Sequence, residues 1–170
     1  MLPPKHASIL FDFECRSQAP QWSPLNDTVM GGCSSSVLRD TRDGTAIFTG
    51  TTSLKNRGGF ASVRAKLIAN QLAGAEGLAI RVRGDGRTYR LLVSEDDRPG
   101  RGCYDIEFAA EADTWQTIGL PFVEMRFNLR GRRPPRTRPA AEKLQSIGLL
   151  IGDKSAGDFA LEVDWIAAYR

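Results

Sequence analysis

Alternation of apolar and polar residues at a period of two limits the fold of this sequence more than any other feature. In residues 78–83, the apolar residues Leu78, Ile80 and Val82 occupy every second position, and Arg81 is one of the residues between them. Side chains at this spacing point to opposite faces of a β-strand, so the run predicts a strand with one buried face. The same period recurs in residues 9–13, 61–67, 104–108 and 159–165.

The last of these runs carries two further expectations. Its alternation predicts that Trp165 shares the apolar face with Phe159, and that Glu162 and Asp164 lie side by side on the other face. Two neighbouring carboxylates can serve as a general acid and base or as calcium ligands, so a hydrolase is one alternative. The other is an ordinary exposed strand face, which we favour.

Turn residues separate the strands and complete the fold prediction. Residues 89–94 and 147–151 are further strand candidates, and residues 68–75 and 140–145 have the spacing for one or two helical turns. With 17 Gly and 9 Pro among 170 residues, the chain favours turns over long helices. We therefore predict an all-β antiparallel sandwich or barrel, formed as a single domain over residues 1–170 with its core at about 9–169.

Several classes of protein are disfavoured by what the sequence lacks. No apolar run approaches the length of a membrane span. Cys15, Cys33 and Cys103 lie far apart, and His6 is the single histidine, so a zinc site and a catalytic triad are both disfavoured. The odd cysteine count and the absence of a recognisable leader favour a reducing, bacterial-type cytoplasm. We expect no metal and no cofactor.

One basic segment stands out from a mildly acidic remainder. Six arginines fall between Glu124 and Glu142 with no acidic residue among them, whereas the whole chain has a net charge of +3. They are Arg126, Arg130, Arg132, Arg133, Arg136 and Arg138. Such a segment suits phosphate, an acidic protein surface or anionic lipid. It equally suits a flexible solubilising loop.

Several segments together resemble the complex I intermediate-associated protein 30 (CIA30) family. Residues 26–34 read NDTVMGGCS, close to the family motif NDxVMGGxS, and residues 48–64 match FxGxxSLxNxGGFxSVR. Residues 84–89 resemble its GDGxxY hairpin, and Trp115, Leu120 and Trp165 continue the order. The resemblance covers the chain from about Phe11 to Ala168. It implies a galactose-binding-like β-sandwich, or jelly roll, in agreement with the alternation.

The resemblance also implies a function without catalysis. Family members in eukaryotes act as mitochondrial assembly factors for respiratory complex I, and related domains in photosynthetic lineages are linked to photosystem assembly. No catalytic residues are attached to the family. The resemblance thus implies a scaffold that binds protein subunits of a membrane oxidoreductase or photosynthetic complex. We expect a cytoplasmic location, peripheral to an inner or thylakoid membrane.

The family motifs supply the candidate binding site. Gly-rich loops permit unusual backbone conformations or close approach of a partner, and loops gather at the ends of a sandwich. We predict that the loops 26–32 and 56–59 form one binding surface; a purely structural role for them is the alternative. The candidate residues are Asn26, Asp27, Met30, Gly31, Gly32, Asn56, Arg57, Gly58 and Gly59.

Two other binding functions stay open at this point. A carbohydrate-binding module would fit the fold, and among the tryptophans Trp22 is the one expected in a loop, where it could stack on a sugar. An RNA-binding protein would use the arginine segment. Phe127 is its single aromatic residue, which gives little support for stacking on bases.

Overall fold

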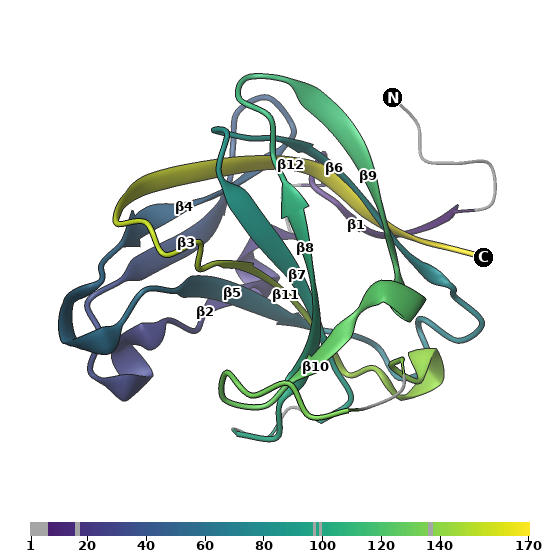
Figure 1. Ribbon diagram of the computed structural model, residues 1–170. Coiled ribbons are helices and arrows are strands. Elements are labelled where there is room, and N and C mark those ends of the chain that lie inside the picture. Colours follow the sequence, from purple (N-terminus) through teal and green to yellow (C-terminus); the bar gives the residue numbers. More distant parts are fainter. Residues whose placement is uncertain (1–6, 16–17, 97, 99, 136–137) are drawn as a thin grey trace.

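The computed structural model describes residues 7–15, 18–96, 98, 100–135 and 138–170 (Figure 1). Its helical segments are all short 3₁₀ turns. The strands are β1 (Ala7–Asp12), β2 (Ser23–Pro24), β3 (Ser35–Asp40), β4 (Ala46–Thr52), β5 (Ala61–Lys66), β6 (Gly77–Arg83), β7 (Thr88–Ser94), β8 (Cys103–Ala109), β9 (Trp115–Pro121), β10 (Arg126–Asn128), β11 (Ser146–Ile151) and β12 (Gly157–Tyr169). The turns are η1 (Ala19–Gln21), η2 (Asp27–Met30), η3 (Lys55–Arg57), η4 (Phe122–Glu124) and η5 (Ala141–Lys143).

Two six-stranded antiparallel sheets pack face to face. Sheet A has the order β3-β4-β12-β6-β9, with β1 also paired to β12, and sheet B has the order β10-β8-β7-β11-β5-β2. Figure 1 shows the long strand β12 running across sheet A. The space between the sheets is filled by large buried side chains such as Phe48, Tyr89 and Leu149. The predicted antiparallel sandwich is therefore confirmed, and no helix among the described residues is long and apolar enough to span a bilayer.

All seven strands expected from the sequence are present, within a few residues at each end. Three longer strands, β3, β4 and β9, have no counterpart among the predicted runs. On β4 the outward face carries Ile47 and the inward face includes Gly50, so apolar and polar residues do not alternate cleanly. The expected helical turn at 140–145 is present as η5, whereas residues 68–75 form turns without a helix.

A β-bulge in β12 overturns the expectation for Trp165. The pairing of β12 with β6 shifts register between Val163 and Trp165. Because one extra residue reverses the faces of a strand, Trp165 does not share the core face with Phe159. It packs instead with Ala79 and Ala167 in a separate small cluster.

Strand register separates the connections into two groups. Ser146 pairs with Lys66 and with Ser94, so the connections 67–76, 95–102 and 129–145 leave sheet B at the same end of its strands. At the other end, Ile151 pairs with Ala61, where the connection 53–60 enters β5. The candidate binding loops and the arginine segment therefore begin at opposite ends of the sheet B strands.

Candidate functional site

The candidate site consists of two connections, residues 25–34 and 53–60, which we call the loop pair. The Asp27 carboxylate, which is completely buried, joins them. Within its own loop it accepts hydrogen bonds from the backbone N–H (2.9 Å) and hydroxyl (2.6 Å) of Ser34. From the other loop it accepts the N–H groups of Gly59 (2.7 Å) and Phe60 (3.3 Å). One side chain thus holds both loops in a single arrangement.

The electrostatics of Asp27 follow from this arrangement. Burial raises the pKa of its carboxyl group, but the hydrogen bonds from Ser34, Gly59 and Phe60 lower the pKa by more. The net result is a pKa below the ordinary value of an aspartic acid. Asp27 is therefore ionised at neutral pH, both of its carboxylate oxygens accept hydrogen bonds within the protein, and it is not a group that exchanges protons.

Two of the motif glycines are explained by the space that Asp27 occupies. A β-carbon at Gly32 or at Gly58 would overlap with the Asp27 carboxyl group. The other two, Gly31 and Gly59, have positive φ angles of 86° and 135°, which favour glycine. The four glycines thus allow the backbone to close around the carboxylate.

Asn26 makes a second connection between the same segments. Its side-chain oxygen accepts hydrogen bonds from the Ser36 hydroxyl (2.6 Å) and from the Ser62 backbone N–H (2.9 Å). The Ser62 hydroxyl in turn donates to the backbone oxygen of Leu25. Asn26 therefore secures the start of the first loop to β3 and β5.

Asn56 and Arg57 form an exposed, left-handed turn in η3. Their φ angles are 55° and 60°, values that side chains other than glycine adopt uncommonly. The Asn56 amide donates to the backbone oxygen of Gly31 (3.1 Å), which joins η3 to the end of η2. The Arg57 side chain is exposed. Residues held in such conformations concentrate at functional sites, because the surrounding structure must compensate for the strain.

Apolar side chains project from the loop pair into solvent. Val29 and Met30 on η2 are each 67% exposed, and Leu54, just before η3, is 48% exposed. Lys55 and Arg57 are exposed beside Leu54. Of these residues, sequence reasoning selected Met30 and Arg57 and missed Val29, Leu54 and Lys55. It also missed Ser34, which contacts Asp27 most extensively although seven positions separate the two in the chain.

The structure thus brings the predicted loops together but divides their residues into two groups. One group determines the shape of the loops: the Asn26 and Asp27 side chains are directed inward, and Gly32 and Gly58 leave room for the Asp27 carboxyl group. Met30 and Arg57 are directed outward, where a partner can contact them. Their role in binding remains a prediction.

The arginine segment is only partly available for binding. Arg133 donates to the Asp105 carboxylate (2.9 Å), which is 5% exposed. The remaining described arginines, at positions 126, 130, 132 and 138, are exposed and form no ion pair with another described residue. Arg136 lies outside the described residues.

The two carboxylates of β12 are both engaged in ion pairs. Asp164 accepts from Arg81 (3.0 Å) and Glu162 accepts from Arg83 (3.0 Å). They share the outer face of sheet A, as expected, and both arginines lie against the Trp115 ring. Each carboxylate is thus already engaged by an arginine side chain, which favours the reading of these residues as an ordinary strand face. Within the described ranges, no three His, Cys, Asp or Glu side chains are grouped to hold a metal ion.

Comparison with solved structures defines the class to which this architecture belongs. The chain is similar to the Family 11 carbohydrate-binding module from Clostridium thermocellum, solved with a β-1,3-1,4-mixed-linked tetrasaccharide, with a TM-score of 0.72 over 98% of this chain and 97% of that chain. It is also similar to a family 29 carbohydrate-binding module, with a TM-score of 0.56 over 95% and 90% of the two chains. At identities of 17% and 11%, these likenesses show a shared fold alone, an all-β antiparallel sandwich of the jelly-roll type.

Within this class, the sequence identifies the family. The model of the complex I intermediate-associated protein 30 (CIA30) family matches residues 11–163, and the chain belongs to that family. The mouse protein of that name, described as mitochondrial, is 24% identical over 97% of this chain and 57% of its own length. A probable counterpart in Caenorhabditis elegans is 30% identical over 82% of this chain and 47% of its length. The chain thus spans about half the length of these relatives.

Proposed function

We propose that this chain is a non-enzymatic assembly factor that binds a protein partner through the loop pair. The partner is a subunit of a membrane respiratory complex of the complex I type, or of a photosynthetic complex, during its biogenesis. The observation that carries the proposal is the exposure of Val29, Met30 and Leu54 on loops that the buried Asp27 holds in one arrangement. The names of the relatives, which associate them with complex I intermediates, support the identity of the partner.

The family motifs strengthen the argument from exposure. Most motif residues of the loop pair are accounted for by folding, because Asn26, Asp27 and Ser34 hydrogen-bond inside the protein. Val29, Met30 and Leu54 belong to the same motifs, yet packing does not account for them. Large apolar side chains that are exposed together at a motif are typical of a protein-binding surface.

The loop pair also has the physical properties that a binding surface requires. Its backbone is already held by the Asp27 and Asn56 hydrogen bonds, so the loops lose little conformational entropy when a partner binds. Lys55 and Arg57 add positive charge at the edge of the apolar residues. We therefore expect a partner with an apolar contact region and acidic neighbours.

Gene replacement in the source organism tests this proposal. In a strain that lacks the chain, we expect fully assembled complex I or photosystem to decrease on native gels and smaller intermediates to accumulate. The wild-type chain should restore assembly, whereas a chain with both Met30→Ser and Leu54→Ser should not. Each lost apolar contact weakens binding by about 1.5 kcal/mol, so the double variant should bind about 100-fold more weakly.

A matched variant separates surface binding from general effects. Ile9→Ser with Val37→Ser also removes two exposed apolar side chains, but outside the loop pair, and it should restore assembly fully. Normal assembly in the deletion strain, or full restoration by the Met30/Leu54 variant, would refute the proposal. Fractionation of the same cells tests the cytoplasmic location that we also propose.

The carbohydrate-binding alternative rests on the shared fold. Trp22, its candidate sugar platform, is buried and packs against Phe11 with ring centroids 5.0 Å apart. A buried ring cannot stack on a sugar, which weighs against this alternative. Failure to bind any glycan on an array would eliminate it.

A further inference from the structure

A second surface of the molecule is independent of the loop pair. The connection 95–102 and the segment 126–138 lie next to each other, since Gly100 packs closely against the guanidinium group of Arg130. We call the described residues of these two segments the basic lobe. Its arginines are Arg98, Arg101, Arg126, Arg130, Arg132, Arg133 and Arg138.

Three carboxylates that the structure describes in or beside the basic lobe already have partners. Asp96 pairs with Arg98 (2.6 Å), and Asp105 pairs with Arg133 (2.9 Å). Glu95 accepts the backbone N–H of Ala140 (2.8 Å). Among the described residues of the basic lobe, four exposed arginines are left without an ion pair: Arg126, Arg130, Arg132 and Arg138. Their positive field is therefore directed to solvent.

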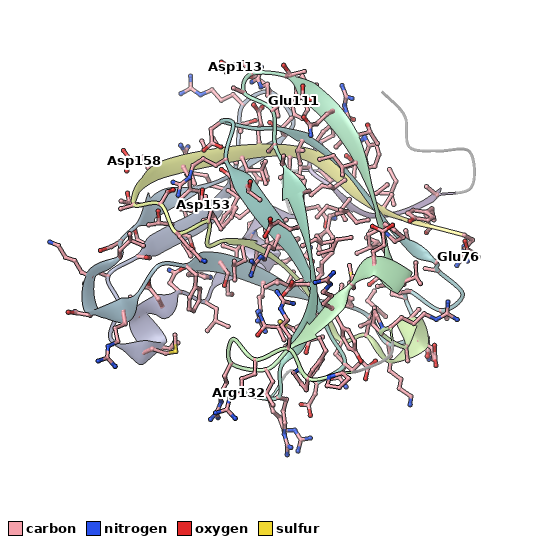
Figure 2. The ribbon with its side chains drawn as sticks, viewed as in Figure 1. Glu76, Glu111, Asp113, Arg132, Asp153 and Asp158 are labelled. Atoms are coloured by element: carbon pink, nitrogen blue, oxygen red, sulfur yellow. The ribbon has the colours of Figure 1, made fainter. Side chains whose placement is uncertain are left out.

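Charge is distributed unevenly over the molecule. In Figure 2, Arg132 lies at the bottom of the molecule and points away from the sheets, whereas Glu111 and Asp113 lie at the top. Glu76, Glu124 and Glu142 lie at the same end of the sheets as the basic lobe but in or beside η4, η5 and β6. An anionic surface would therefore attract the molecule with the basic lobe foremost.

Exposed apolar side chains occur at this end as well. Ile68 is 75% exposed in the connection 67–76, and Val123 is 71% exposed on η4. Lys66, which precedes the first connection, pairs with Ser146, and Pro121, which precedes η4, pairs with Gly77. This register places both connections at the same strand ends as the basic lobe.

Exposed arginines together with exposed apolar side chains favour an anionic membrane surface as the partner. Arginine binds phosphate groups through paired hydrogen bonds, and projecting apolar side chains favour the boundary between headgroups and acyl chains. RNA is less well matched, because the Phe127 ring is buried against Tyr104 and is not available to stack on bases. We propose that the basic lobe docks on an anionic phospholipid bilayer, with the free arginines at lipid phosphates and with Ile68 and Val123 at the membrane interface.

Vesicle sedimentation with the full chain tests this proposal without any protein partner. Vesicles of phosphatidylcholine with one third phosphatidylglycerol should bind the chain, and vesicles of pure phosphatidylcholine should not. Binding should fall steeply between about 0.1 M and about 1 M salt, where the Debye length falls from about 10 Å to about 3 Å. Because no partner is present, the result does not depend on the proposed assembly function.

Two matched triple variants identify the surface. Arg130→Gln, Arg132→Gln and Arg138→Gln together should weaken binding about 100-fold, since each arginine near a membrane contributes about a factor of five. Arg39→Gln, Lys55→Gln and Lys154→Gln remove the same charge from exposed positions outside the basic lobe and should leave binding unchanged. Equal melting temperatures show that all variants are folded.

A third variant tests the apolar contribution. Ile68→Ser with Val123→Ser should weaken vesicle binding several-fold and leave its salt dependence unchanged. Equal binding to both kinds of vesicle would overturn the proposal, as would equal loss of binding in the two triple variants. Tighter binding to single-stranded RNA than to vesicles, at equal phosphate concentration, would assign the basic lobe to nucleic acid instead.

Discussion

Replacing Asp27 by asparagine removes one charge from the centre of the loop pair and leaves the shape of the side chain almost unchanged. The asparagine oxygen can still accept the Ser34 N–H, but its NH₂ group then faces the N–H groups of Gly59 and Phe60. Each buried donor left without an acceptor costs about 1–3 kcal/mol, so two cost about 2–6 kcal/mol. We expect a loss of about 4 kcal/mol in the free energy of unfolding.

Urea unfolding and thermal melting measure this loss. For a chain of 170 residues, about 4 kcal/mol corresponds to a decrease in melting temperature of about 8–16 °C. Asp158→Asn is the matched control, because the exposed Asp158 accepts one hydrogen bond, from Thr51 (2.6 Å). We expect it to cost less than about 1 kcal/mol. A loss below about 1 kcal/mol for Asp27→Asn, or equal losses in both variants, would refute the reasoning.

The pH dependence of stability provides an independent check. Because the pKa of folded Asp27 lies below its unfolded value of about 3.9, its stabilisation is fully present above that pH. It is lost as the pH falls through the folded pKa, where protonated Asp27 resembles asparagine. The gap in stability between wild type and Asp27→Asn should therefore be constant near neutrality and narrow below about pH 4. A gap that stays constant down to pH 2 would contradict the assigned ionisation.

Two further predictions concern groups outside the loop pair. Arg87→Ala should destabilise the chain by about 3–5 kcal/mol in urea unfolding, because Arg87 donates two hydrogen bonds to Asp153 (2.9 and 2.6 Å) and one to the Ser155 oxygen (2.7 Å). Loss of the more exposed Arg90–Glu107 pair should lower the free energy of unfolding by less than about 1 kcal/mol. Equal losses from the Arg87 and Arg90 substitutions would refute the prediction. Burial raises the pKa of the Cys103 thiol, so mass spectrometry should detect its alkylation by iodoacetamide after that of the exposed Cys15 and Cys33. Equal rates for all three thiols would contradict its burial.

The strands were predictable where polarity alternates cleanly along the chain. Residues 78–83 and 104–108 carry this local signal, and both became strands whose apolar face contributes to the core, as expected. The bulge near Trp165 was not predictable in the same way, because it depends on pairing with β6 rather than on composition. Similarly, β9 is an edge strand with both faces partly exposed, so its residues show no alternation.

For the candidate site, the sequence indicated which loops meet but not what each residue does there. The burial of Asp27 depends on Gly59 and Phe60, which lie more than thirty positions away. An aspartate beside asparagine and two glycines resembles a solvated turn when only local residues are considered. The role of the carboxylate becomes visible only when the second loop closes over it.

The exposure of Val29 and Met30 is itself a consequence of the Asp27 cluster. A turn of four residues has few positions, and in η2 the first is committed to the buried carboxylate. The C-terminal end of η2 is joined to η3 through the Asn56 amide, which prevents the turn from rotating its apolar side chains inward. The same hydrogen bonds that stabilise the loop pair therefore keep apolar surface in contact with water, at a cost of about 1–2 kcal/mol for each side chain that could otherwise be buried. A family motif that specifies both the inward hydrogen bonds and the outward apolar residues is best explained by a partner that covers those residues. This explanation fails if Met30→Ser and Leu54→Ser together leave complex assembly unchanged.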